Sequence, residues 1–283
     1  MLVTELPCLV IVAFYVSMRL RAATESRAFV LRFVAIVLAS AIGENSMIAF
    51  YGAYAYAPTW SLSIGHVPVV VVLVWPVVVD SALVLASQIA PLGPSGRALV
   101  AAAIVFTDAL LIEPIAVFSG LWSWAEGGLF HVPLLGIAGW AFFTFGVSLT
   151  LEKTRGLAVF GVLVAGPGTA HALVLASHWV FFRWVRMELP PDALIAITWT
   201  LALFLSASVL RWGASPSRGA VLLRAPGAVF FFALLAVGEG DERIALAWFA
   251  LPFSMPYWVM LRPGARSLTT SSEQPASPSR ASH

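Results

Sequence analysis

The sequence has little charge and only one cysteine, and both shortages exclude classes of protein. Charged residues make up 11% of the 283 residues, whereas about a quarter of a soluble domain is charged. Cys8 has no second cysteine with which to form an internal disulfide or a thiolate metal site. The chain is therefore neither a soluble globular domain nor a disulfide-stabilised scaffold, and no redox role follows from its cysteine.

Several catalytic signatures are missing as well. The sequence contains no Walker loop, no glycine-rich dinucleotide fingerprint after a strand, no G-x-S-x-G motif and no histidine-rich metal boxes. We therefore expect no metal, no cofactor and no nucleic-acid partner. The first segment also lacks the basic flank and the small-residue cleavage site of a signal peptide, so we expect it to remain as a helix.

Long apolar runs fill most of the chain, since 60% of the residues are hydrophobic. About 20 apolar helical residues cross a bilayer core, and these runs are far longer than the alternating segments of an outer-membrane barrel. The sequence thus predicts an all-α, polytopic transmembrane helix bundle of about eight or nine spans. The nine candidate spans are Leu2–Met18, Phe29–Tyr51, Val67–Ile89, Ala98–Phe118, Val132–Leu151, Leu157–Phe182, Leu194–Leu210, Gly219–Val237 and Ile244–Leu261.

The basic residues indicate how the bundle lies in the membrane. With the amino terminus outside, all Lys and Arg except Arg183, Arg186 and Arg243 fall on the cytoplasmic side. The positive-inside rule therefore favours a cytoplasmic carboxy terminus in the inner (plasma) membrane. We expect residues 1–262 to form one membrane domain, and residues 263–283, which are rich in Ser, Pro and Arg, to form a disordered cytoplasmic tail.

Two stretches of the chain repeat the same uncommon order of residues. Each has a glutamate in an apolar run, a glycine-led loop with an aromatic-x-aromatic pair, His-Val-Pro, and a tryptophan nine residues after the histidine. Because the second stretch begins two spans after the first, the sequence predicts a parallel duplication of a helix-loop-helix unit. The copy at about residues 40–80 contains Glu44, Tyr54, Tyr56, His66 and Trp75, and the copy at about residues 108–145 contains Glu113, Trp122, Trp124, His131 and Trp140.

Four acids lie within the predicted spans, and all four are candidate catalytic residues: Glu44, Asp80, Asp108 and Glu113. Inserting an ionisable side chain at a helix centre costs roughly 2.5–3.5 kcal/mol, so such residues are usually functional. We expect no lysine or arginine at a depth that pairs with all four, which favours the neutral carboxyl, a proton donor. The alternative is that each carboxyl only hydrogen-bonds a neighbouring helix.

Helical geometry separates two of these acids. Asp108 and Glu113 are five residues apart, so at about 100° per residue they point roughly 140° away from each other. Only a bend at Pro114 would bring both to one ligand. Glu113 is therefore the better candidate, and we expect Asp108 to support it or to occupy the opposite face.

Aromatic and histidine side chains of the two copies are candidate substrate-binding groups. At a rise of about 1.5 Å per residue, the tryptophans of the returning helices lie about as deep as the glutamates, and their ring faces can hold a cation. The loop aromatics either belong to the site or form an ordinary interfacial belt. The candidates are Trp75, Trp140, Trp122, Trp124, Tyr54, Tyr56, His66 and His131.

A separate pair of histidines occurs later in the chain. His171 and His178 are seven residues apart and so share one helix face. This spacing suits a metal pair or a proton relay, but no cluster of further ligands accompanies the two histidines. Hydrogen bonding between helices is therefore the favoured role.

Taken together, the repeated residues resemble a known family, the membrane carotenoid-biosynthesis proteins that include the CruF-type carotenoid hydratases. The resemblance covers about residues 40–150. It rests on Glu44, residues 51–56, Val67-Pro68, Asp108, residues 113–116, residues 120–124, Val132-Pro133 and Gly139-Trp140. It implies hydration of a terminal carbon-carbon double bond of a long polyene dissolved in the bilayer.

Such a hydration needs an acid to protonate the alkene, a surface that tolerates a tertiary cation, and a held water. The expected partners are a lipophilic carotenoid or terpenoid substrate, membrane lipid and other enzymes of the carotenoid pathway. On this hypothesis the proton donor is Glu113 or Glu44, the walls that face the cation are Trp140 and Trp75, and the base that orients water is Asp80 or Asp108.

Two other functions suit the same residues. A proton-initiated cyclase or isomerase of terpenoids or carotenoids would use the same acid and aromatic walls, and its cation would lose a proton instead of gaining water. A proton-coupled transporter of a lipophilic solute would use buried acids to carry protons. Transporter repeats usually span whole halves of a chain, however, and this duplication is shorter.

Overall fold

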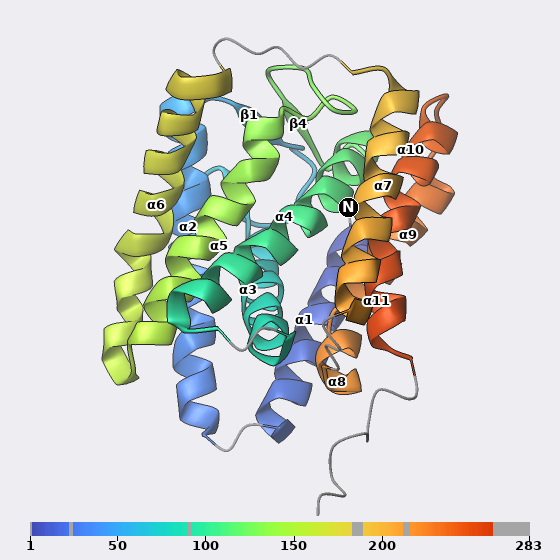
Figure 1. Ribbon diagram of the computed structural model, residues 1–283. Helices are drawn as coiled ribbons and strands as arrows, with labels where there is room; N and C mark the ends of the chain where they lie inside the picture. Colours follow the sequence, from blue (N-terminus) through green and yellow to red (C-terminus); the bar gives the residue numbers. More distant parts are fainter. Residues whose placement is uncertain (1, 23–24, 90–91, 183–188, 212–215, 263–283) are drawn as a thin grey trace, which may run out of the picture.

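The computed structural model shows a bundle of long helices, as expected from the sequence (Figure 1). Seven helices in the described part of the chain are long and apolar enough to cross a membrane. The prediction of an all-α, polytopic bundle is therefore confirmed. The predicted tail at residues 263–283 lies outside the described residues. The structure describes all residues except 1, 23–24, 90–91, 183–188, 212–215 and 263–283.

The expected spans correspond to helices with two differences. The first expected span forms α1, which is not one of the seven helices that meet the criteria for crossing a membrane. The last expected span is interrupted. Pro252 and Pro256 lack the backbone N–H that a continuous helix needs at these positions, so α10, a 3₁₀ turn and α11 replace one long helix. The helices are α1 (Leu2–Ala22), α2 (Ser26–Tyr51), α3 (Val69–Ile89), α4 (Pro94–Phe118), α5 (Leu134–Lys153), α6 (Val162–Ser177), α7 (Pro191–Arg211), α8 (Arg218–Leu222), α9 (Ala225–Val237), α10 (Arg243–Ala250) and α11 (Met255–Met260).

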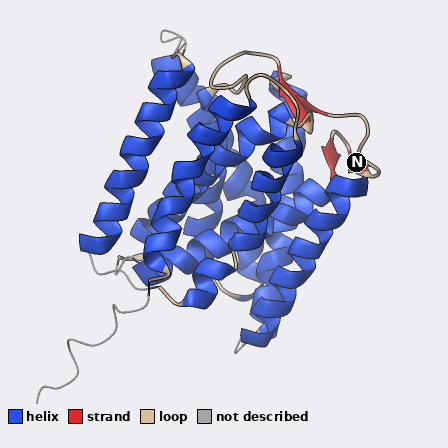
Figure 2. Cartoon of the chain, turned by 90° about the vertical axis from the view of Figure 1, so that its right-hand side faces the viewer, coloured by secondary structure: helices blue, strands red, loops and turns tan. Residues whose placement is uncertain are grey.

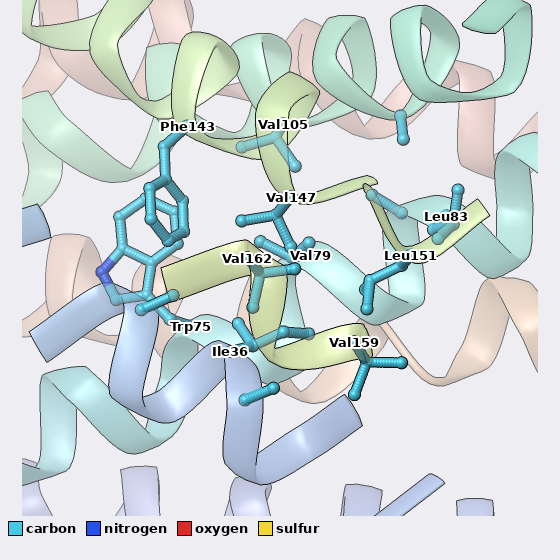
Figure 3. Close-up of a cluster of buried hydrophobic side chains, with 14 of the residues drawn as sticks. Ile36, Trp75, Val79, Leu83, Val105, Phe143, Val147, Leu151, Val159 and Val162 are labelled. Carbon is cyan, nitrogen blue, oxygen red and sulfur yellow. The ribbon is translucent and has the colours of Figure 1, made fainter. Parts of the chain in front are cut away.

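The helices form two groups around a central pair. Helices α2, α5 and α6 lie on one side, α7 and α9–α11 lie on the other, and α3 and α4 lie between them (Figure 1). Apolar side chains of α2, α3, α4, α5 and α6 meet in one core (Figure 3). In that core, Trp75 of α3 packs edge-on against Phe143 of α5, with ring centroids 4.8 Å apart. This packing fixes the helices that carry the repeated residues.

Short strands cross one end of the bundle, on the same side as the amino terminus (Figure 2). Strand β1 (Tyr54–Tyr56) pairs antiparallel with β4 (Trp122–Trp124), and β2 (Ser63–Ile64) pairs with β3 (Val67–Pro68). Strands β1 and β4 each follow a glycine in the left-handed conformation, Gly52 after α2 and Gly120 after α4. Such a glycine commonly ends a helix. The glycine of each copy therefore turns the chain from helix into strand.

The β1–β4 ladder is symmetric with respect to the two copies. Ala55 faces Ser123 at its centre, and one aromatic pair lies on each side. Exchanging the first copy for the second maps each aromatic pair onto the other. A local twofold axis therefore passes through the Ala55–Ser123 pair, which is what a parallel duplication produces.

Two of the four intramembrane acids are paired with arginines. Asp80 accepts hydrogen bonds from Tyr15 (2.5 Å) and Arg19 (2.9 Å) of α1. Asp108 forms an ion pair with Arg224, just before α9, and accepts a hydrogen bond from Tyr257 Oη (3.2 Å). No described cation thus pairs with all four acids, as expected, but each aspartate has an arginine partner that the sequence did not reveal.

The reason is the reach of the two arginines. The sequence places Arg19 and Arg224 near the cytoplasmic ends of apolar runs, but a long arginine side chain can extend back along the bundle. Arg224 also donates to Ser81 Oγ (2.5 Å), next to Asp80. Asp80 and Asp108 thus attach α1 and the carboxy-terminal helices to the central pair α3 and α4.

Removing one partner of the Asp108–Arg224 ion pair tests whether it holds the carboxy-terminal helices to α4. Arg224→Met leaves the Asp108 carboxylate without its cation, so we expect the free energy of unfolding in detergent to fall by about 3 kcal/mol. The double variant Asp108→Leu with Arg224→Met should regain most of that loss. Chemical denaturation followed by circular dichroism measures both. Equal stability of the wild type and Arg224→Met would contradict the role of the pair.

Candidate active site

Glu113 lies on α4 with a nearly fully buried side chain, and three indoles hold its carboxyl group. Trp140 Nε1 donates to Oε1 at 2.7 Å. Trp122 Nε1 and Trp124 Nε1 both donate to Oε2, at 2.8 and 3.0 Å. All three donors belong to the same copy of the repeat as Glu113. The residues that the repeat singles out in this copy therefore form one hydrogen-bonded cluster around Glu113.

Glu44 on α2 has the same arrangement with different donors. Trp75 Nε1 donates to Oε1 at 2.9 Å, as Trp140 does in the other copy. Tyr54 and Tyr56 both donate their hydroxyl protons to Oε2, the latter at 3.1 Å. The two copies thus use corresponding positions and corresponding carboxyl oxygens. They differ in one respect, because hydroxyl groups replace two of the three indoles.

The spacing of the repeat explains how each cluster forms. Alternate residues of a strand point to the same face, so an aromatic-x-aromatic sequence directs both rings the same way. The tryptophan of the returning helix reaches the carboxyl group because it lies at the same depth as the glutamate, as the sequence predicts. The strand of each copy therefore supplies two donors to the carboxyl group, and the returning helix supplies one.

Contacts across the twofold axis join the two clusters. Trp75 and Trp140 lie with ring centroids 4.7 Å apart, and Tyr54 and Trp124 lie 4.8 Å apart. Neighbouring aromatic rings at such distances attract each other by about 0.5–1.5 kcal/mol beyond the burial of their surface. The two copies therefore build one site instead of two separate ones.

A cavity of about 440 Å³ opens between these groups. Both glutamates, the two deep tryptophans and the four loop aromatics line it, and α6 closes one side. Its size is that of an ordinary small-molecule site. The other lining residues are mostly apolar apart from the exposed Glu126, so the cavity suits a lipophilic ligand that the carboxyl groups of Glu44 and Glu113 can reach. Among the lining residues that the sequence did not indicate are Ser40, Met47, Phe143 and Val174.

No cation neutralises the two glutamates among the residues that the structure describes, in contrast to Asp80 and Asp108. Neutral N–H and O–H groups replace water around them instead. Burial raises the pKa of the Tyr54 and Tyr56 hydroxyls well above the usual value, so both stay protonated at neutral pH. Across the described ranges, no group of three His, Cys, Asp or Glu residues is suited to hold a metal ion.

Four candidate residues lie away from the cavity. Asp80 and Asp108 are held in the ion pairs described above, and the partners of Asp108 are different from those of Glu113. His66 and His131 are exposed in the turns before the returning helices. The backbone N–H of the first donates to Asn45 (2.7 Å), and the ring of the second lies 3.3 Å from a carboxylate oxygen of Glu242.

The later histidine pair divides between two roles. His171 contacts Ser46 (2.8 Å) and Tyr51 (2.9 Å) through its two ring nitrogens and so joins α6 to α2, which is the role favoured from the sequence. His178 lines the cavity at the point where α6 changes into a π-helical turn. Such turns are frequent at functional sites. The spacing of His171 and His178, which places both on one helix face, was the only signal in the sequence for a role of His178.

A glycine under the Glu113 cluster provides a test of the geometry. A Cβ atom on Gly136 would lie 2.3 Å from the ring of Trp124, so Gly136→Ala must displace this indole from Glu113. We expect the free energy of unfolding to fall by about 1–3 kcal/mol, the usual range for overpacking. Thermal unfolding and near-ultraviolet circular dichroism in detergent measure the change.

The matched control lies one helical turn further along α5. A Cβ atom on Gly139 meets its nearest neighbour, Val174, at 3.9 Å, so Gly139→Ala should leave stability and the aromatic spectrum unchanged. If Gly136→Ala behaves like this control, the position assigned to Trp124 is wrong.

Comparison with known proteins adds one finding. A family described as "Carotenoid biosynthesis protein" matches residues 3–207, well over half of the chain. The match includes both copies of the repeat and ends within α7. No curated protein and no solved structure matches the chain.

Proposed function

The chain belongs to the carotenoid biosynthesis protein family, and we propose that it hydrates a terminal double bond of an acyclic carotenoid inside the membrane. One observation carries this proposal: Glu44 and Glu113, without a cationic partner among the described residues, line a single, mostly apolar cavity with aromatic walls. A polyene end fits such a cavity by its lipophilic character. Two carboxyl groups can supply both an acid and a base.

The reaction can be written without a cofactor. A carboxylic acid protonates the inner CH carbon of an isopropylidene end, which leaves a tertiary cation on the outer carbon that carries the two methyl groups. The π faces of Trp75 and Trp140 stabilise this cation. Water then forms a C–O bond to the cation and gives its extra proton to the second carboxylate. The sum is one alkene and one water converted into one tertiary alcohol.

The structure changes which residues can serve as the base. Asp80 and Asp108, the bases expected from the sequence, are bound to arginines and do not line the cavity. We therefore assign both proton-transfer roles to Glu44 and Glu113; the third carboxyl of the lining, Glu126, is exposed. Tyr54, Tyr56, Trp122 and Trp124 then act by orienting these carboxyls, while their rings form part of the cavity wall.

Replacing either glutamate tests the proposal. Glutamine keeps the shape of the side chain but has no proton to donate, so Glu44→Gln and Glu113→Gln should each lower hydrate formation by about 10²- to 10⁴-fold. The measurement is mass-resolved chromatography of pigments from a bacterial host that makes an acyclic carotenoid. Glu239→Gln, which changes an exposed glutamate away from the cavity, should give wild-type yields.

Product mass separates this function from the two alternatives. Full hydrate yield from either variant would remove that carboxyl from the reaction. A product with the same mass as the substrate would instead favour a cyclase or isomerase. Transport without any chemical change would favour the carrier, in which the buried acids only bind and release protons.

We also propose that the protein lies in the inner membrane with the strand end outside. In support, the basic residues of the long helices lie mostly at the other end, as the positive-inside rule requires. Green fluorescent protein fused after residue 262 should fluoresce, whereas alkaline phosphatase at the same point should be inactive. The opposite pair of results would reverse the orientation.

A further inference from the structure

Glu44 and Glu113 occupy equivalent positions in the cavity but have different donors, and this difference assigns their roles. We propose that Glu44 donates the proton to the alkene and that Glu113, as a carboxylate, stabilises the cation and accepts the proton from water. The assignment rests on the proposed hydration. It follows from the chemistry of indole and phenol groups.

Indole donors favour the ionised form of Glu113. An indole N–H can only donate a hydrogen bond, and Glu113 receives three of them. Hydrogen bonds to an ionised acceptor are roughly twice as strong as those between neutral groups. Protonating Glu113 would weaken all three at once. None of the three indoles can accept a bond in return.

Phenol donors suit both forms of Glu44. A tyrosine hydroxyl donates one hydrogen bond and also accepts. When Glu44 carries a proton, the acid O–H can donate to Tyr54 or Tyr56, and the hydroxyl proton can turn to another acceptor. Either of the two tyrosine bonds around Glu44 can therefore reverse, one at a time, whereas none around Glu113 can. Hydroxyl groups can also pass a proton along, which allows Glu44 to be reprotonated.

The free lone pairs lie on corresponding oxygens. An ionised carboxyl group offers about four acceptor positions, and three are occupied in each cluster. In each carboxyl, Oε2 receives two donors and Oε1 receives one. The remaining position is on Oε1, beside the indole of Trp75 or Trp140. Because these indoles touch across the twofold axis, both open positions lie near the centre of the site.

Access to the surroundings agrees with this division. The side chain of Glu113 is only 3% exposed, whereas Glu44 is partly exposed. The group that must be reprotonated after each turnover is thus the one with better access to the surroundings. In the reaction, Glu44 loses its proton to the alkene carbon, and Glu113 receives one from the attacking water. Exchange through solvent restores both.

Deuterium exchange separates the two steps. In D₂O, protonation that reverses before water attacks introduces deuterium into recovered substrate, whereas completed hydration yields labelled alcohol. We expect Glu113→Gln to raise the ratio of exchange to hydration by about tenfold or more, because the cation still forms but water is not deprotonated. Glu44→Gln should lower exchange and hydration together. Membranes containing the full chain and an acyclic carotenoid with isopropylidene ends serve for the assay.

Milder variants keep the test valid if either glutamine variant is unstable. Trp124→Phe removes one donor from Glu113 and should raise the ratio, while Tyr56→Phe should lower both rates and leave the ratio unchanged. The reverse pattern, with exchange retained in Glu44→Gln and lost in Glu113→Gln, would overturn the assignment but not the hydration. Wild-type protein that forms no hydrate and exchanges no deuterium would overturn the proposed function itself.

Discussion

A carboxyl group inside a membrane requires other parts of the protein to replace water around it. This chain meets that requirement in two ways. Asp80 and Asp108 receive arginines, which neutralise their charge and bind distant helices together. Glu44 and Glu113 receive indole and phenol donors, which satisfy most of their lone pairs but leave one open. The first arrangement is suited to stability, and the second leaves an acid that can react.

Duplication of a helix-loop-helix unit provides the framework for the second arrangement. Each copy folds its own loop aromatics and its own deep tryptophan onto its own glutamate. The β1–β4 ladder and the contact between Trp75 and Trp140 then join the copies around one cavity. Because the two copies place their donors at corresponding positions, differences in side chains decide the chemistry. Tyrosine in one copy and tryptophan in the other give two carboxyl groups with different tendencies to hold a proton.

Much of this framework could be predicted from the sequence. Hydropathy gave the bundle, and the repeated order of residues indicated the equal depth of each glutamate and its tryptophan. The arginine partners of Asp80 and Asp108 could not be predicted, because a flexible side chain near a helix end can reach inward or outward. The ladder between β1 and β4 was also missed, since three-residue strands have no clear periodicity. His178 became part of the cavity through the packing of α6, which the sequence does not specify.

The central claim is that both carboxyl groups act on one substrate end inside a shared cavity. An experimental structure of the protein in lipid with a bound acyclic carotenoid tests it most directly. We predict that one end of the polyene lies against Trp75 and Trp140, with Oε1 of Glu44 and of Glu113 directed at its terminal double bond. Density for the polyene only on the outer surface of the bundle, with the cavity closed to it, would contradict this account.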